Sequence, residues 1–372
     1  MRSGPAGLRH SARILLAAGG LLVTTATAGA LAQDATPVPS ASVSAPSLVI
    51  STWADYTPQD LPATVEAELG TPLTIRYHTT DAEILATLEA GGDPGIDVAF
   101  VSGESAQRLA AEGLLEPIDH ALVPALANLF PEASELAYDP GNVWSVPYTW
   151  GTAGLCYRTD LVATAPDSWN DLLIPAADVS GRTTMMSDPR WMLLPAQKAL
   201  GFSANTTDPA QLEKVQQLLE AAQPTLLAYD DSTFYSRLVS GEAALVESWD
   251  SWCDYAIADP TVGSQVAFVV PAEGAALWAD TMVIPRASRH KDAAHGFIDL
   301  ILRPENHGWV VENLLYKVPD RVTMERVDPA LLAAFPDLAM TPADLLKQEG
   351  LQDLGEASAA RYQQIAAAVV AR

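Results

Sequence analysis

The chain has 372 residues, of which 49% are hydrophobic, and a formal net charge of −25, so it is long enough for two domains of ordinary size. This composition is typical of a globular protein and excludes a chain that is disordered or embedded throughout in a membrane. The excess of acidic residues repels nucleic acid and anionic membrane surfaces, which excludes both as partners, and it attracts cationic ligands.

The first 32 residues have the pattern of an export signal. Three arginines precede a short apolar run over 14–23, and Ala30-Leu31-Ala32 matches a cleavage site of small residues. We expect cleavage before Gln33; the alternative is an uncleaved N-terminal anchor. Cleavage leaves 18 Lys and Arg against 46 Asp and Glu, a net charge of −28. No cysteine lies near this site, so a lipid anchor is not expected, and we predict a periplasmic or extracellular protein.

Residues 33–47 are rich in Pro, Ser, Ala and Val and predict a flexible linker. From Leu48 onward, strand and helix patterns alternate. Strands are predicted at Ser47–Thr52, Leu73–Tyr77, Ile96–Val101, Ala153–Tyr157, Thr183–Met186, Ala243–Glu247, Val266–Val270 and Thr281–Ile284. Helices are predicted at Leu61–Leu69, Asp81–Ala90, Ser105–Glu112, Arg190–Leu200, Ala210–Ala222, Phe234–Ser240, Lys291–Leu302 and Glu305–Leu315, and the segment Pro342–Arg372 is expected to be largely helical.

This alternation predicts an α/β fold with mostly parallel sheets flanked by helices. Two such sets of elements, one on each side of residue 150, predict two lobes with a ligand cleft between them. The two cysteines, Cys156 and Cys253, form a disulfide in one interpretation and are two separate buried thiols in the other, because spacing alone does not distinguish them.

The motifs of common enzymes and metal sites are missing from the sequence. It has no nucleophile elbow, zinc-binding helix, phosphate-binding loop or dinucleotide fingerprint. His290 and His295 are five residues apart and do not share a helical face, so we expect neither a metal site nor a cofactor. A secreted enzyme with an unrecognised site stays open as a minor alternative, as does a scaffold or adhesion role.

Tryptophan and aspartate recur together at the ends of the predicted strands. The pairs are Trp53 with Asp55, Asp188 with Trp191, Trp249 with Asp250, and Trp278 with Asp280. Core packing explains a single tryptophan, but an unpaired buried aspartate is rare, so four such pairs favour a binding site. A carboxylate accepts charge-assisted hydrogen bonds from an ammonium group, worth about 1.5–3 kcal/mol each, and an indole face attracts a cation and packs methylenes.

These residues belong to a longer series of motifs that resembles the bacterial spermidine/putrescine-binding proteins of ABC importers. The resemblance runs from about Leu48 to the C-terminus. The motifs, in order, are Trp53-Ala54-Asp55-Tyr56, Ile96-Asp97-Val98 leading to Ser102, Val146-Pro147-Tyr148-Thr149-Trp150-Gly151, Ser168-Trp169-Asn170-Asp171-Leu172, the run Gly201 to Pro209, Leu277-Trp278-Ala279-Asp280-Thr281 continuing to Pro285, and Leu302-Arg303-Pro304-Glu305.

The resemblance implies a two-lobed periplasmic-binding-protein fold of type II that closes on its ligand about a hinge. It implies one lobe from residues 48–148 and 280–317 and a second from 149–279 and 318–372. It also implies a monomer that holds a small cationic solute, a polyamine such as putrescine or spermidine, and delivers it to the membrane permease of an ABC importer.

The resemblance also implies roles for individual residues. Asp55 and Asp280 hold amines, Asp188 meets an ammonium from the other lobe, and Ser102 hydrogen-bonds the ligand. Aromatic side chains line or close the pocket: Trp53, Tyr56, Trp249, Trp278 and Tyr316.

The sequence departs from the spermidine-type pattern at three places. Glu104 replaces a tyrosine, Trp191 replaces a glutamate, and a glutamine expected near residues 350–352 is replaced. Both Glu104 and Trp191 are therefore candidate ligand-binding residues, and the number of bound amines stays open. Another small amine, an amino acid derivative or an opine in the same cleft is the alternative.

Overall fold

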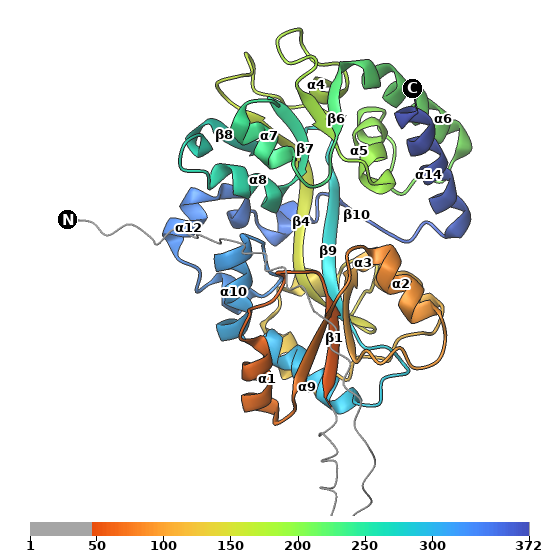
Figure 1. Ribbon diagram of the computed structural model, residues 1–372, viewed down its shortest axis with the longest axis vertical. Helices are drawn as coiled ribbons and strands as arrows, with labels where there is room; N and C mark the ends of the chain where they lie inside the picture. The colour runs from red at the N-terminus through yellow and green to blue at the C-terminus, as the bar shows by residue number, and fades with distance from the viewer. Residues whose placement is uncertain (1–46, 372) are drawn as a thin grey trace, which may run out of the picture. The chain divides into compact units, whose positions relative to one another are not determined.

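The computed structural model describes residues 47–371, which fold into alternating helices and strands (Figure 1). The predicted export signal and most of the predicted linker lie outside the described residues. The strands are β1 (Leu48–Thr52), β2 (Leu73–Tyr77), β3 (Val98–Ser102), β4 (Ser145–Arg158), β5 (Thr183–Met185), β6 (Leu226–Tyr229), β7 (Leu245–Trp249), β8 (Val266–Val269), β9 (Ala276–Val283) and β10 (Glu349–Gly350).

The longer helices connect these strands or cover them. They are α1 (Leu61–Leu69), α2 (Asp81–Glu89), α3 (Gly103–Ala111), α5 (Pro189–Ala199), α6 (Pro209–Ala222), α7 (Phe234–Ser240), α8 (Asp250–Ile257), α9 (Lys291–Ile301), α10 (Pro304–Leu314), α12 (Pro329–Ala334) and α14 (Glu356–Val370). Short helices occur at Asn170–Leu173 (α4), Arg321–Met324 (α11) and Pro342–Leu345 (α13), and a 3₁₀ turn (η5) at Pro336–Ala339.

Local sequence explains where the helices that border the site begin. The Thr80 hydroxyl accepts from the Glu83 amide at the start of α2, and the Ser102 hydroxyl accepts from the Ser105 amide at the start of α3. Asp188 caps α5 in the same way, and Pro189 follows it at the first helical position. Each cap directly follows a strand or a short loop, so these helices begin at the carboxyl ends of strands.

The strands lie in the order β2-β1-β3-β9-β4-β7-β5-β6, with β8 added beside β4 and β10 beside β9. β1 is parallel to β2 and β3, and β5 is parallel to β6 and β7. The long strands β4 and β9 are antiparallel to each other and lie side by side in Figure 1. Residues 145–152 of β4 pair with β9, whereas residues 153–158 pair with β7 and β8, so β4 leaves one sheet and enters the other.

The side chains form two separate sets of hydrophobic cores. One set includes Leu48, Phe100, Tyr148 and Phe297, together with a smaller cluster from β3, α2 and α3. The other includes Leu155, Trp169, Leu193 and Ile365, together with a smaller cluster from β4, β7, α7 and α8. Residues 318–346, which the resemblance assigned to the second lobe, contribute Val318, Val327, Leu338 and Leu345 to the first set. The chain enters the second set at Leu351, directly after β10. The lobe boundaries stay a prediction.

Several predicted elements differ from the observed ones. β9 begins at Ala276 rather than Thr281, so Trp278 and Asp280 lie inside this strand rather than before it. β6 and α8 were missed, and β10 interrupts the C-terminal segment expected to be largely helical. Cys156 of β4 and Cys253 of α8 form a disulfide, with their Cα atoms 5.7 Å apart.

Candidate functional site

A cavity of about 710 Å³, referred to below as the pocket, opens where the two sets of cores meet. The first set contributes the loop after β1, the start of α2 and the start of α3. The second contributes the start of α5, the loop after β6 and the first turns of α8. β9, shared by both, contributes Trp278 and Asp280. The volume is typical of sites that enclose a small organic ligand.

Eleven of the twelve residues proposed from the sequence line this pocket. They are Trp53, Asp55, Tyr56, Ser102, Glu104, Asp188, Trp191, Trp249, Trp278, Asp280 and Tyr316. They come from segments up to 263 residues apart in the chain, between Trp53 and Tyr316, so the fold brings together what the sequence shows only as scattered motifs.

Asp250 is the proposed residue that does not line the pocket. Its side chain is buried, and its carboxylate accepts from Lys317 Nζ at 2.5 Å and from the Thr152 amide at 3.1 Å. Because the ammonium of Lys317 already compensates this carboxylate, Asp250 connects α8 to β4 and to the segment after α10. Its other carboxylate oxygen accepts from the Ser251 amide at 2.9 Å.

Asp280 lies in β9, opposite Ser102 of β3 and Thr149 of β4. Its Oδ2 accepts from the Tyr56 hydroxyl at 2.5 Å and from the Thr149 hydroxyl at 3.4 Å. The pKa of Asp280 is raised to about 7, chiefly by burial and also by the nearby carboxylates of Asp81 and Glu104, against the opposing effect of these two hydrogen bonds. A cation beside this carboxylate would restore its negative charge.

Glu104 projects from the first turn of α3. Burial raises its pKa to about 7; the guanidinium of Arg190 opposes this rise, and the Asp81 carboxylate adds to it. In total, six carboxylates and one guanidinium line the pocket: those of Asp55, Asp81, Glu104, Asp188, Asp231, Asp280 and Arg190. The pocket is therefore strongly negative, and two of its acids are poised to lose a proton near neutral pH.

Aromatic rings form much of the remaining surface. Trp53 meets Tyr56 edge-on at 5.2 Å, Trp278 meets Tyr316 at 5.8 Å, and Trp191 meets Trp249 at 5.6 Å between ring centroids. The Trp252 indole N–H donates to the Tyr316 hydroxyl at 2.7 Å. These contacts fix the ring orientations before any ligand arrives, which lowers the entropic cost of binding.

Gly151 permits the close approach of Trp278. A β-carbon at residue 151 would lie 2.5 Å from the Trp278 ring and 2.5 Å from an Asp250 oxygen, which real β-carbons do not tolerate. The motif Tyr148-Thr149-Trp150-Gly151 therefore places the Trp278 indole in the pocket by leaving space for it.

The sequence did not reveal several lining residues, chiefly Asp81, Asp231, Arg190, Trp252 and Tyr255. Asp231 follows β6, and Trp252 and Tyr255 are in α8, so they were missed together with these two elements. The rule that found the other acids, an aspartate after a strand, would also have found Asp231. Asp81 was assigned only to a helix start, and its carboxylate accepts from the Ser102 amide and the Ser105 hydroxyl.

This set of side chains can hold an organic cation. Its carboxylates accept hydrogen bonds from N–H groups, and its indole and phenol rings attract positive charge and pack methylenes. Within residues 47–371, no group of three or more His, Cys, Asp or Glu side chains has the arrangement of a metal site.

Residues 70–310 match the family of bacterial extracellular solute-binding proteins. The chain belongs to this family. This solute-binding protein is 32% identical to the putrescine/cadaverine-binding protein of Pseudomonas aeruginosa, over 90% of this chain and 94% of the relative. It is 27% identical to the spermidine/putrescine-binding periplasmic protein of Salmonella typhimurium, over 95% and 96% of the two chains.

A solved structure supports the same assignment of fold. The spermidine/putrescine ABC transporter substrate-binding protein of Streptococcus pneumoniae superposes with a TM-score of 0.75 at 25% identity, covering 87% of this chain and 98% of that one. The predicted fold class, a two-lobed α/β periplasmic-binding-protein fold, is thus confirmed. In the part of the chain that the structure describes, every helix is too short or too polar to cross a bilayer.

Proposed function

We propose that this solute-binding protein captures a polyamine, of the putrescine or spermidine class, and presents it to the permease of an ABC importer. The observation that carries the proposal is the convergence of Asp55, Glu104, Asp188 and Asp280 with tryptophan rings around one pocket. The relatives named above bind putrescine, cadaverine or spermidine according to their names, which supports the same ligand class here.

In this proposal Asp280 is the principal carboxylate. It is held by Tyr56 and Thr149, and an ammonium replaces the proton that it retains in the empty pocket. Asp55 is the second carboxylate for the ligand, and Trp53, Trp249 and Trp278 pack the methylenes. The protein binds its ligand without a chemical step, acts as a monomer, and works in the periplasm or outside the cell after export.

A second candidate ligand is favoured by one observation. Arg190 lines the same pocket, and a guanidinium is a natural partner for a carboxylate. A molecule with an amine at one end and a carboxylate at the other, such as γ-aminobutyrate, would use both Arg190 and Asp280. A polyamine offers Arg190 no acceptor.

Thermal unfolding of residues 33–372 with different ligands tests the proposal. The ligands are putrescine, cadaverine, spermidine, spermine, γ-aminobutyrate and arginine. A ligand at 100 times its Kd stabilises the folded state by about 2.7 kcal/mol, so the melting temperature should rise by several degrees. We expect this rise with polyamines. A rise with γ-aminobutyrate alone would support the second candidate, and no rise with any amine would refute both.

Binding should also depend on pH. Burial raises the pKa of both Asp280 and Glu104 to about 7, so these carboxyls are partly protonated in the empty pocket near neutrality. An amine of pKa near 10 stays charged, and its binding must expel these protons. For each coupled carboxyl, the affinity for putrescine should therefore fall about tenfold between pH 8 and pH 6.

Isothermal titration calorimetry in buffers of different ionisation enthalpy measures this effect. The expected result is proton release at pH 7 that becomes small at pH 9. An affinity that is flat from pH 6 to pH 8, with no proton release, would show that the ligand avoids both carboxyls.

A further inference from the structure

Arg190 is the single cationic side chain among the described residues that line the pocket. It is the second residue of α5, two positions after the capping residue Asp188. Neither the family resemblance nor the tryptophan–aspartate pairs pointed to it. In a pocket otherwise lined by six carboxylates, a fixed positive charge opposes the binding of a cation and needs an explanation.

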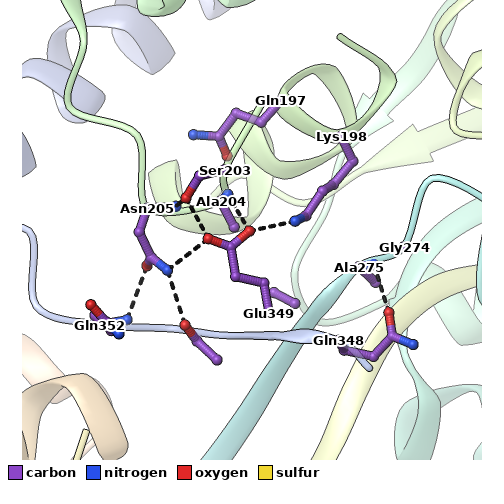
Figure 2. Close-up of polar contacts among 12 residues, drawn as sticks. Gln197, Lys198, Ser203, Ala204, Asn205, Gly274, Ala275, Gln348, Glu349 and Gln352 are labelled. Carbon is purple, nitrogen blue, oxygen red and sulfur yellow. Dashed lines mark hydrogen bonds and ion pairs between the residues drawn. The ribbon is translucent and has the colours of Figure 1, made fainter. Parts of the chain in front are cut away.

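The scaffold holds one nitrogen of this guanidinium, whereas Nε and Nη1 are buried without a hydrogen-bond partner among residues 47–371. Arg190 Nη2 donates to Asn205 Oδ1 at 2.8 Å, and the Arg190 guanidinium carbon lies 5.6 Å from the centroid of the Tyr362 ring. The Asn205 side-chain oxygen also accepts from the backbone amide of Gln352 at 3.0 Å. The side-chain nitrogen of Asn205 donates to Glu349 Oε1 at 3.1 Å and to the Gly350 carbonyl at 2.9 Å. Figure 2 shows Asn205 projecting from the loop before α6 toward the segment that contains Glu349 and Gln352.

Glu349 is anchored in turn, so the whole arrangement is rigid. Its carboxylate accepts from Lys198 Nζ at 2.5 Å, from the Ala204 amide at 2.8 Å and from the Ser203 hydroxyl (Figure 2). The side-chain oxygen of Asn205 accepts two hydrogen bonds and its side-chain nitrogen donates two. These four bonds allow one orientation of the side-chain amide, in which the oxygen faces Arg190. None of the carboxylates in the pocket takes part in this network.

The charge of Arg190 acts on two of the carboxylates in the pocket. Its side chain makes no direct ion pair with any acid in residues 47–371, but its backbone amide donates to Asp188 Oδ1 at 2.9 Å, and Glu104 lines the same pocket. Its charge opposes the rise that burial causes in the pKa of both carboxyls. An ammonium that approached Glu104 or Asp188 would meet this positive charge. The pKa of Asp280, in contrast, is set by burial, by its two hydrogen bonds and by Asp81 and Glu104, and Arg190 is not among these causes.

We propose that Arg190, oriented by Asn205, determines specificity by occupying the place of a third ammonium beside Glu104 and Asp188, so that the pocket selects diamines over spermidine. This inference rests on the proposed function and narrows it. Of the other four carboxylates, Asp81 already accepts from Ser102 and Ser105, and Asp231 accepts from Ser187. Asp55 and Asp280 then remain for the two ammonium groups of a diamine, whereas the extra ammonium of a triamine is repelled. Arg190 thereby limits the number of ammonium groups that a bound ligand can have, and the aromatic rings pack the methylenes of that ligand.

Isothermal titration calorimetry with putrescine, cadaverine and spermidine tests the inference on residues 33–372. The wild-type protein should bind putrescine or cadaverine at least tenfold more tightly than spermidine. Arg190→Gln should raise the affinity for spermidine about tenfold and change that for putrescine by less than threefold. Because the gain depends on freeing Glu104, it should disappear in the double variant Arg190→Gln/Glu104→Gln.

Arg361→Gln is the matched control. Arg361 is exposed, lies in α14 beside Tyr362, and contacts Gln216 at 3.4 Å, so its loss removes the same charge from a residue that does not line the pocket. It should leave the preference for diamines unchanged. Arg190→Lys keeps the charge and should keep the preference, and it is the variant to measure if Arg190→Gln does not fold.

The outcomes separate this inference from the proposed function. Arg190 does not set specificity if the wild-type protein binds amines but Arg190→Gln gains no affinity for spermidine. The same holds if Arg190→Lys loses the preference for diamines. If Arg190→Gln abolishes binding of γ-aminobutyrate while polyamines never bind, the guanidinium holds a ligand carboxylate, and the inference is overturned. If the wild-type protein binds no amine, the proposed function itself fails.

Discussion

Asp280→Asn is expected to lower the affinity for putrescine by about 100-fold or more, because removing one partner of a buried, hydrogen-bonded charge pair costs about 2–5 kcal/mol. The Asp280 carboxylate already accepts from Tyr56 and Thr149, and asparagine preserves one acceptor for these hydroxyls. The substitution therefore removes the charge with little change in shape. Isothermal titration calorimetry at pH 8 measures the loss.

The same variant should fold without a loss of stability. Burial raises the pKa of Asp280 to about 7, above the value near 4 of an unfolded chain. The folded state therefore binds more protons than the unfolded state between these values, so the ionised carboxylate destabilises the fold increasingly from about pH 4 to pH 7 and by a constant amount above that. Without ligand, Asp280→Asn should melt at an equal or higher temperature at pH 8, and at the same temperature as the wild type at pH 4 or below.

Glu135→Gln, which removes an exposed charge elsewhere, is the control and should bind putrescine normally. Normal binding by Asp280→Asn would show that this carboxylate does not hold the ligand. Loss of binding accompanied by a lower melting temperature at pH 8 would indicate a structural defect instead.

Removing the disulfide is expected to have the largest effect on stability. Cys156 and Cys253 are 97 residues apart, and closing a loop of that length constrains the unfolded chain by up to about 4.7 kcal/mol. Cys156→Ala/Cys253→Ala should lower the free energy of unfolding by about 3–4 kcal/mol, within the range of about 2–5 kcal/mol typical of native disulfides. Urea unfolding of the two proteins, with and without a reducing agent, measures the difference.

Reduction should shift the wild-type midpoint toward that of the double variant and leave the double variant unchanged. Titration of the denatured, unreduced wild-type protein should find no free thiol. Two free thiols, with a midpoint insensitive to reduction, would contradict the pairing. Because α8 presents Trp252 and Tyr255 to the pocket and is attached to β4 by this disulfide, reduction should also weaken ligand binding.

The sequence predicted well those elements whose boundaries have a local cause. α1, with Gly70 after it, and α7, with Gly241 after it, were predicted at their observed limits, since each ends in a left-handed glycine that L-residues disfavour. β1 and β2 were also placed correctly to within a residue, because their apolar runs are bounded by polar and turn-forming residues.

The elements that were missed depend on tertiary pairing. β4 extends from Ser145 to Arg158, but Pro147 and Gly151 made its first half look unlike a strand; this half is stabilised by pairing with β9. α8 has Trp, Cys and Tyr, which have low intrinsic helix propensity, and it is held by the disulfide and by packing of its aromatic rings.

The candidate site shows the same division. A tryptophan near an aspartate is visible in sequence, so most of the acids and rings of the pocket were found. Asp250 fits that pattern equally well, yet its charge is compensated by Lys317, a partner 67 residues away that no local pattern reveals. Arg190 was missed for a similar reason, because its orientation depends on Asn205 and, through it, on the distant segment near Glu349.

The central claim is that carboxylates and indole rings from both sets of cores surround one organic cation. A crystal structure of residues 33–372 grown with putrescine tests it most directly. We predict one ligand in the pocket, with an ammonium nitrogen about 3 Å from an Asp280 carboxylate oxygen and methylenes against Trp249 or Trp278. Putrescine bound elsewhere, or in the pocket with neither ammonium near Asp280, would contradict the account.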